Sequence, residues 1–305
     1  MAIELNNLRV YALGLAHRAV SDISRDGFRQ LRNYVDMCAF LAKTEDQQRF
    51  FDRAQTALEK TDSLYYPLIQ RTLSTVSADS ICTVGVNLGI DALTYGGSQL
   101  KKHAQETGKP VYWMTVADSA EGDALQPRIT QGEDAGQFLW ILLSRDGSVD
   151  AAQCLAGTHP KSDFGLVLPA QAITPQITAR LADSPNLIPI LSLDSPEITD
   201  EVHTAVHLLQ SRKIFFGIIV RLTDDTIGQA LDAEWLEVLS QHTLFCTYTH
   251  PGVAKEKTIA LRDAIYRTRT TTGAPVVLFD WEYDTVNIGG FISPLAQVEY
   301  RAHME

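Results

Sequence analysis

The stretches NLIPILSLDS at residues 186–195 and KIFFGIIVRLTD at residues 213–224 decide the fold class. Each contains a short, nearly continuous apolar run rich in Ile, Leu and Val, which is typical of a strand that is covered on both faces. Similar runs recur about every 25 residues from residue 110 onwards, and most are separated by stretches with the periodicity of an amphipathic helix. Strands that alternate with helices predict βαβ units and a parallel sheet.

Seven apolar runs are predicted as strands, and they cover residues 111–116, 138–143, 164–168, 187–193, 214–220, 244–248 and 276–281. Seven strands suit a barrel or a partial barrel, although an open parallel sheet has the same periodicity. One intervening helix is predicted to begin at Ser195-Pro196, with serine as the N-cap and proline at the first helical position. Its buried face would contain Val202, Val206 and Leu209.

The first part of the chain is predicted to be helical. Apolar residues recur there at steps of three and four, at Phe28, Leu31, Val35, Cys38 and Leu41. Thr44 and Gln47 have the spacing of a capping box, which marks the start of a further helix. Two more helical segments are expected at residues 63–75 and 80–107, the last with four glycines that allow close packing or breaks. We therefore divide the chain into a helical extension at residues 1–109, which packs on the barrel, and an α/β part at residues 110–305.

Composition argues against several classes of function. The 305 residues carry a net charge of −11, and an acidic surface repels phosphate backbones and anionic lipids, so neither nucleic acid nor a membrane is expected as a partner. No apolar run approaches the roughly 18 residues that span a bilayer. Glu4 and the absence of a basic start argue against a signal peptide. The cysteines are scattered without a CxxC pair, which predicts four free thiols in the cytoplasm, at Cys38, Cys82, Cys154 and Cys246.

Three ordered stretches resemble the radical S-adenosylmethionine (SAM) family. Residues 186–195 resemble its fourth strand, residues 213–224 its fifth, and PVVLFDWEYDTVNIGGFI at 275–292 is similar to its segment P-x-x-x-x-D-[FW]-x-x-D…G-G-C-I. VNLGIDALTYGG at 86–97, followed by PVYWMTVAD at 110–118, also resembles the lead into its first strand. The resemblance covers residues 63–300. It implies a TIM-like (β/α)6-type partial barrel that is preceded by a helical N-terminal extension.

The same comparison reveals departures from the family. The family binds a [4Fe–4S] cluster through a CxxxCxxC loop after its first strand, but the residues after Asp118 contain no cysteine. The glycine-rich motif after the second strand is replaced by SRDG at 144–147, and Phe291 stands where the late motif has cysteine. Because iron–sulfur clusters need thiolates, we interpret the chain as a degenerate member with no cluster, no SAM and no metal site.

Six polar side chains lie at or just past the predicted ends of strands, where a barrel has its active-site mouth: Asp118, Asp194, Arg221, His250, Glu282 and Asp284. They could supply a general acid, a general base and an anion anchor, and the fork of Arg221 suits a carboxylate or a phosphate. The interpretation we favour is inherited scaffold and loop solvation. Asp280 matches the family aspartate and is interpreted as structural.

The leading hypothesis is a non-catalytic, radical-SAM-like pseudoenzyme. It would act as a binding or scaffolding partner of an active homologue or of that homologue's substrate, with a homo-oligomer as another possibility. The alternatives are a metal-independent enzyme that uses the carboxylates and Arg221, and a binder of a SAM-like nucleotide at the barrel mouth. No catalytic residue can be assigned from the sequence.

Overall fold

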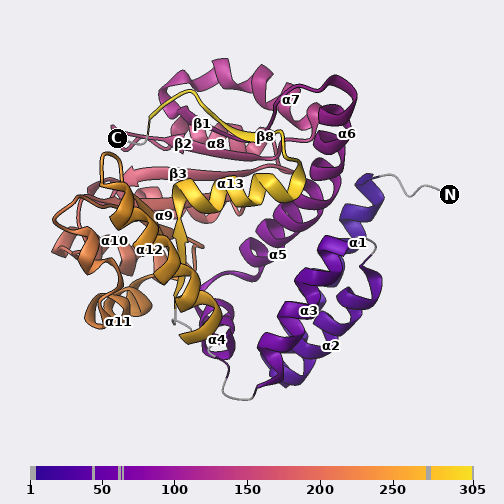
Figure 1. The fold of residues 1–305 in the computed structure, drawn as a ribbon, viewed down its shortest axis with the longest axis horizontal. Coiled ribbons are helices and arrows are strands. Elements are labelled where there is room, and N and C mark those ends of the chain that lie inside the picture. Colours follow the sequence, from indigo (N-terminus) through magenta and orange to yellow (C-terminus); the bar gives the residue numbers. More distant parts are fainter. Residues whose placement is uncertain (1–4, 43–44, 61–62, 64, 273–275, 304–305) are drawn as a thin grey trace.

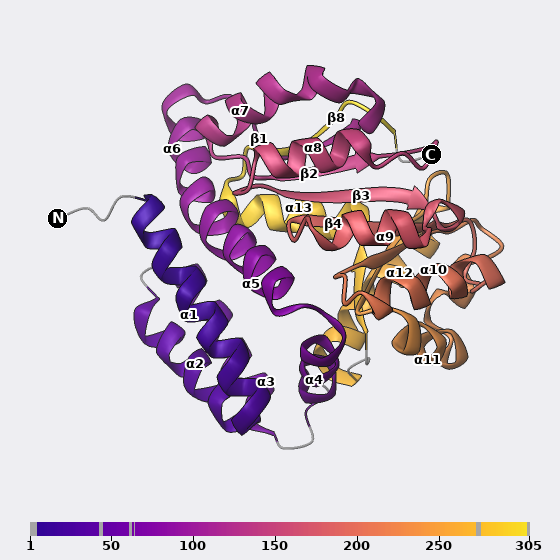
Figure 2. The same ribbon diagram turned by 180° about the vertical axis from the view of Figure 1, so that it is seen from behind.

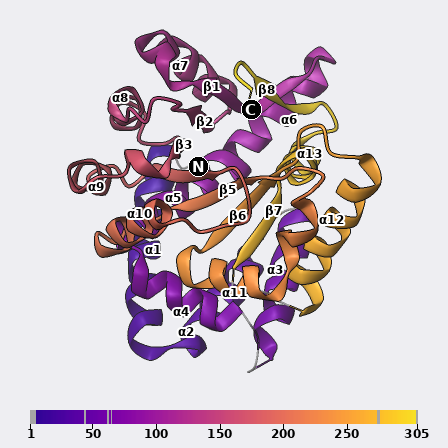
Figure 3. The same cartoon turned by 90° about the vertical axis from the view of Figure 1, so that its left-hand side faces the viewer.

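The computed structural model describes residues 5–42, 45–60, 63, 65–272 and 276–303. Its centre is a sheet of eight strands with the order β7-β6-β5-β4-β3-β2-β1-β8, in which every neighbouring pair is parallel. The sheet curls into a half-barrel (Figure 3). The strands are β1 (Val111–Asp118), β2 (Leu139–Leu143), β3 (Asp163–Pro169), β4 (Leu187–Leu193), β5 (Gly217–Arg221), β6 (Phe245–Thr249), β7 (Val277–Asp280) and β8 (Ala296–Tyr300). The predicted TIM-like α/β partial barrel with a helical N-terminal part is confirmed.

The seven predicted strands correspond to β1 to β7, but β8 was not predicted. Its sequence is AQVEY, and its residues are partly covered or exposed because it lies at the edge of the sheet beside β1. An edge strand needs no continuous apolar run, so its sequence carries a weak signal.

Helices cover the outer face of the half-barrel between successive strands (Figures 1 and 2). They are η2 (Ser119–Leu125), α7 (Gln126–Ala135), α8 (Asp150–Thr158), η3 (Ala170–Ala172), α9 (Pro175–Ala182), α10 (Asp200–Ser211), η4 (Ile227–Leu231), α11 (Ala233–His242), α12 (Lys255–Arg267) and η5 (Thr268–Thr272). Together with the strands they enclose one large apolar core, which includes the fully buried Trp140, Phe164 and Tyr248.

The predicted start of α10 at Ser195-Pro196 is wrong. The helix begins at Asp200, and the Thr199 side chain accepts the hydrogen bond of the Val202 backbone at 3.4 Å. Serine and threonine are both favoured N-cap residues, so the choice between them depended on the loop that follows β4. The predicted buried face of this helix is confirmed at Val202, Val206 and Leu209.

The N-terminal helices are α1 (Leu5–Asp26), α2 (Phe28–Leu41), α3 (Glu45–Glu59) and α4 (Tyr65–Thr75), and the predicted cap Thr44 lies outside the described residues. A long helical rod follows, made of α5 (Ala78–Val86), the π-helix η1 (Asn87–Gly96) and α6 (Gly97–Thr107). The rod lies between α1 and the sheet (Figures 1 and 2).

The rod packs on the amino ends of the strands. Asn87 donates a 2.8 Å hydrogen bond to the carboxylate of Asp163, the first residue of β3. Gly96 approaches Gly136 so closely that a Cβ atom there would lie 2.2 Å from the Gly136 carbonyl oxygen. The prediction that glycines of this segment allow close packing therefore holds at Gly96. The rod covers the amino ends of the strands and leaves the carboxyl ends available for a site.

Helix α13 (Trp281–Ile292) connects the two edges of the sheet. It follows β7 directly, precedes β8, and lies in the gap between these two strands (Figure 3). Gly289 allows α13 to approach β1, since a Cβ atom there would meet the Trp113 indole nitrogen at 2.9 Å. Ile292 completes a second apolar cluster with Leu100 of α6 and Met114 of β1.

The described residues include no single helix that is both long and apolar enough to cross a membrane. The pair Tyr65–Thr75 and Ala78–Thr107 meets those criteria only when combined, and it is bent by 117°.

Candidate functional site

The six candidate residues all lie at the carboxyl end of the half-barrel, but the structure brings only some of them together. Asp118 ends β1, and its carboxylate accepts the Ala120 backbone hydrogen bond at 2.9 Å, which starts η2. Asp194 follows β4 and is exposed, and Arg221 ends β5 and is also exposed. None of these three contacts another candidate through its side chain in the described part of the chain.

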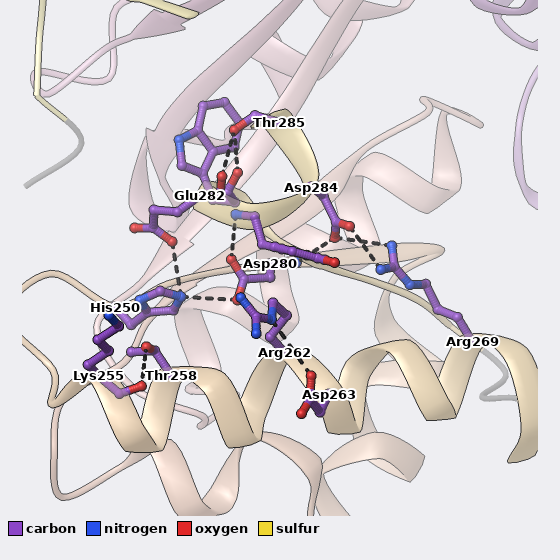
Figure 4. Close-up of polar contacts among 12 residues, drawn as sticks. His250, Lys255, Thr258, Arg262, Asp263, Arg269, Asp280, Glu282, Asp284 and Thr285 are labelled. Carbon is purple, nitrogen blue, oxygen red and sulfur yellow. Dashed lines mark hydrogen bonds and ion pairs between the residues drawn. The ribbon is translucent and has the colours of Figure 1, made fainter. Parts of the chain in front are cut away.

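His250, Asp280 and Glu282 form the compact part of the site (Figure 4). The His250 Nε2 atom lies 3.2 Å from Asp280 Oδ2 and 3.0 Å from Glu282 Oε2, so one ring nitrogen faces two carboxylates. About 11% of the His250 side chain and 2% of the Asp280 side chain are exposed, whereas Glu282 is 48% exposed. The group therefore has a buried base and one side open to solvent.

The sheet register explains why residues thirty positions apart meet. Strands β6 and β7 pair so that Tyr248 is opposite Asp280. His250 follows β6 by one residue, and Glu282 lies in the first turn of α13. Both side chains therefore reach the same point above the ends of these two neighbouring strands.

Asp280 has a second function as the N-cap of α13. Its Oδ1 atom accepts the Tyr283 backbone hydrogen bond at 2.9 Å, while Oδ2 faces His250. N-capping side chains satisfy backbone donors that a helix otherwise leaves unpaired. The conformation of this carboxylate is therefore fixed by the helix and not by the histidine alone.

Asp284, a predicted ligand-binding residue, instead supports the backbone. Its Oδ2 atom accepts the hydrogen bond of the Asp280 backbone nitrogen at 2.8 Å, and both its oxygens pair with Arg269 of η5 at 2.9 and 3.1 Å (Figure 4). Because Asp284 is buried and fully engaged by these contacts, its carboxylate is a positioning group for Asp280.

The electrostatics of the site follow from this arrangement. The hydrogen bond to Asp280 raises the pKa of His250 above its ordinary value; burial opposes this rise, and the charge of Glu282 adds to it. Burial is also the main reason that the pKa of Glu282 is raised, and the nearby His250 opposes that shift. The imidazole thus has a higher proton affinity than a free histidine, because two carboxylates surround it.

A [4Fe–4S] cluster does not fit the residues present. The four cysteines lie on α2, α5, α8 and β6, and within the described ranges none belongs to a group of three or more metal-ligating side chains. The segment after β1 is the cysteine-free helix η2. Burial raises the pKa of Cys82 to about 11, which disfavours the thiolate that a cluster needs.

A cleft of about 250 Å³ lies elsewhere, beside α6, α7, β1 and the edge strand β8. Its charged residues are already paired, since Glu299 accepts a hydrogen bond from Thr115 at 3.0 Å and contacts Arg128 at 2.7 Å. It is separate from the group at His250.

Sequence reasoning missed the central position of Asp280. The signal was present, because Asp280 is the last residue but one of the strand predicted at 276–281, Glu282 follows it by two residues, and His250 follows the strand predicted at 244–248. The expectation of no metal site considered cysteines and histidines, whereas the fold brings one histidine to two carboxylates.

No known family model matches the sequence, and no curated protein matches it. Among solved structures, the chain is similar to Streptococcus suis SuiB bound to S-adenosylmethionine, with 12% identity, a TM-score of 0.47, and coverage of 59% of this chain and 53% of that chain. It is also similar to SuiB bound to the precursor peptide SuiA, with 12% identity, a TM-score of 0.46, and coverage of 59% and 51%. The chain thus spans about half the length of the SuiB chains.

The tryptophan synthase alpha chain from Legionella pneumophila has 10% identity and a TM-score of 0.42, over 67% of this chain and 84% of that chain. What this protein does must be inferred from its own side chains.

Proposed function

We propose that this chain is a radical-SAM-like protein that does not carry out radical chemistry and acts as a binding or scaffolding partner of an active homologue. The observation that carries the proposal is the separation of the four cysteines on four elements, with none on the segment after β1. A protein that keeps the strands of a half-barrel without thiolates for a cluster retains a framework for binding.

The surface of α13 supports a protein partner. Val286 is 70% exposed and Phe291 is 65% exposed, and both lie on the helix that fills the gap between the edge strands. Large apolar side chains that are exposed to solvent are candidate contacts for a protein partner. The proposal assigns the chain neither SAM nor a cluster as cofactor. It also includes a cytoplasmic location, in which the four free thiols stay reduced.

The first test of this function is anaerobic reconstitution of the full chain with iron and sulfide. We expect no stoichiometric [4Fe–4S] cluster by iron and sulfide analysis and by absorption. A cluster bound at one per chain would show that the protein is not a degenerate homologue.

The second test is recovery of partners from the native host with a tagged chain, read by mass spectrometry. We expect one cluster-bearing radical SAM protein in near-equal amounts, and its loss with the double variant Val286→Asp, Phe291→Asp. Val10→Asp, at another exposed apolar position, is the matched control and should retain the partner. Recovery of the chain alone, or only with copies of itself, would contradict the proposed partner.

A second candidate function is binding of a small ligand at the barrel mouth. The convergence of His250, Asp280 and Glu282 favours it. The same convergence leaves out Arg221, so it does not support an enzyme or a nucleotide site built around that residue. Calorimetric titration with SAM tests the nucleotide alternative, and we expect no binding heat.

A further inference from the structure

We propose that His250, Asp280 and Glu282 form a binding site for one divalent transition-metal ion, with Zn²⁺ as the ion that the donor set matches best. The ligand atoms are His250 Nε2, Asp280 Oδ2 and Glu282 Oε2. This inference goes beyond the proposed partner function and does not depend on it.

The spacing of the three atoms fits a tetrahedral ion. Ligands at about 2.0–2.1 Å from a tetrahedral zinc ion lie about 3.4 Å from one another. The nitrogen lies 3.2 and 3.0 Å from the two oxygens, and the three atoms all lie within 4.8 Å of one another. Small side-chain adjustments are therefore enough to admit the ion between the three atoms.

The supporting contacts already orient the ligands. Asp280 Oδ1 is bound by the Tyr283 backbone, so Oδ2 alone is free to face the ion. Asp284 fixes the Asp280 backbone nitrogen, and Arg269 fixes Asp284. Partners of this kind, which hold a metal ligand in one orientation, contribute strongly to metal affinity.

Charge and donor type select the class of ion. Two carboxylates balance the charge of a divalent cation, and a neutral imidazole nitrogen suits zinc and its neighbours in the transition series. Mg²⁺ and Ca²⁺ prefer sites made of oxygen ligands alone. The three protein ligands leave one tetrahedral position for water or another ligand.

The test uses the full chain, stripped with a chelator and then dialysed against Zn²⁺, with bound metal measured by elemental analysis and affinity measured by competition with a chromophoric chelator. We expect one Zn²⁺ per chain. Glu282→Gln should weaken binding at least tenfold, and His250→Ala should abolish it. His207→Ala, at an exposed histidine on α10, should bind as the unaltered chain does.

Glu282 is half exposed, so its substitution should leave the fold intact, and circular dichroism with a thermal melt checks this for each variant. Co²⁺ serves as a spectroscopic substitute, and its visible absorption should report a four-coordinate ion that is lost in His250→Ala. Absence of stoichiometric metal in the unaltered chain would overturn the proposal. So would binding that remains equally tight in folded Glu282→Gln and His250→Ala.

Discussion

The carboxylate of Asp284 lies 2.8 Å from the backbone nitrogen of Asp280 and accepts its hydrogen bond, so the last residue of β7 is held by a side chain one helical turn further along. Arg269 in turn holds Asp284 through two hydrogen bonds. The position of Asp280 therefore depends on Arg269 of η5, which acts on it through Asp284 in the first turn of α13.

Removing the Arg269 side chain should lower the stability of the fold. Arg269→Ala would leave the buried Asp284 carboxylate without its charged donor, and we expect a loss of about 2–3 kcal/mol in the free energy of unfolding. Urea unfolding followed by circular dichroism measures it. Arg267→Ala removes a neighbouring exposed arginine and should change the free energy by less than about 0.5 kcal/mol. Equal effects of the two variants would contradict the supporting function of Arg269.

The close contact between Gly96 and Gly136 predicts that substitution by alanine has opposite effects on stability at two glycines of the helical rod. Gly96→Ala would place a methyl group against a backbone carbonyl, and we expect destabilisation of about 1–3 kcal/mol. Gly85→Ala, in the same helical rod but with open space around it, should instead stabilise the protein by about 1 kcal/mol. Thermal melts of both variants test this, and a stabilising Gly96→Ala would show that the rod does not pack closely on the sheet.

The buried Asp163 predicts a pH dependence of stability. Burial raises its pKa well above the ordinary value, so the folded chain keeps a proton that the unfolded chain releases near about pH 3.9. The stability that this residue contributes is present below about pH 3.9. It is lost as the pH rises towards the folded-state pKa, at about 1.4 kcal/mol per pH unit between the two values.

Asp163→Asn removes this titration and keeps an oxygen for the hydrogen bond from Asn87. We therefore expect the unaltered chain to lose more stability than the variant between about pH 4 and pH 7, in chemical denaturation at a series of pH values. Parallel curves for the two proteins would exclude Asp163 as the source.

Burial also predicts an order of thiol reactivity. Cys154 is exposed, whereas Cys82 and Cys246 are buried, and burial raises the pKa of both buried thiols. Because the thiolate is the reactive form, an aromatic disulfide reagent should modify Cys154 first in the folded protein. Cys154→Ser should remove the fast phase and Cys82→Ala should retain it. A fast phase that survives in Cys154→Ser would show that another thiol is accessible.

The sequence predicts the strands far better than the site. Runs such as Leu187–Leu193 and Gly217–Arg221 are mostly apolar because most of their side chains are buried or partly covered, so burial is reflected in the composition of each run. The edge strand Ala296–Tyr300 was not predicted, because it is partly exposed to solvent and lacks a continuous apolar run. Whether His250 meets Asp280 or Asp194 depends on strand order and register, which no local pattern specifies.

Helix α13 connects β7 and β8, the two edge strands of the sheet. Its first turn contains the carboxylate of Glu282, and its last residue is followed within a few positions by β8, which is bound to β1. Displacement of β8 from β1 would therefore pull on the same helix that orients the His250 group. The edge of the half-barrel at β8 and the group at His250 are thus joined through one helix, α13.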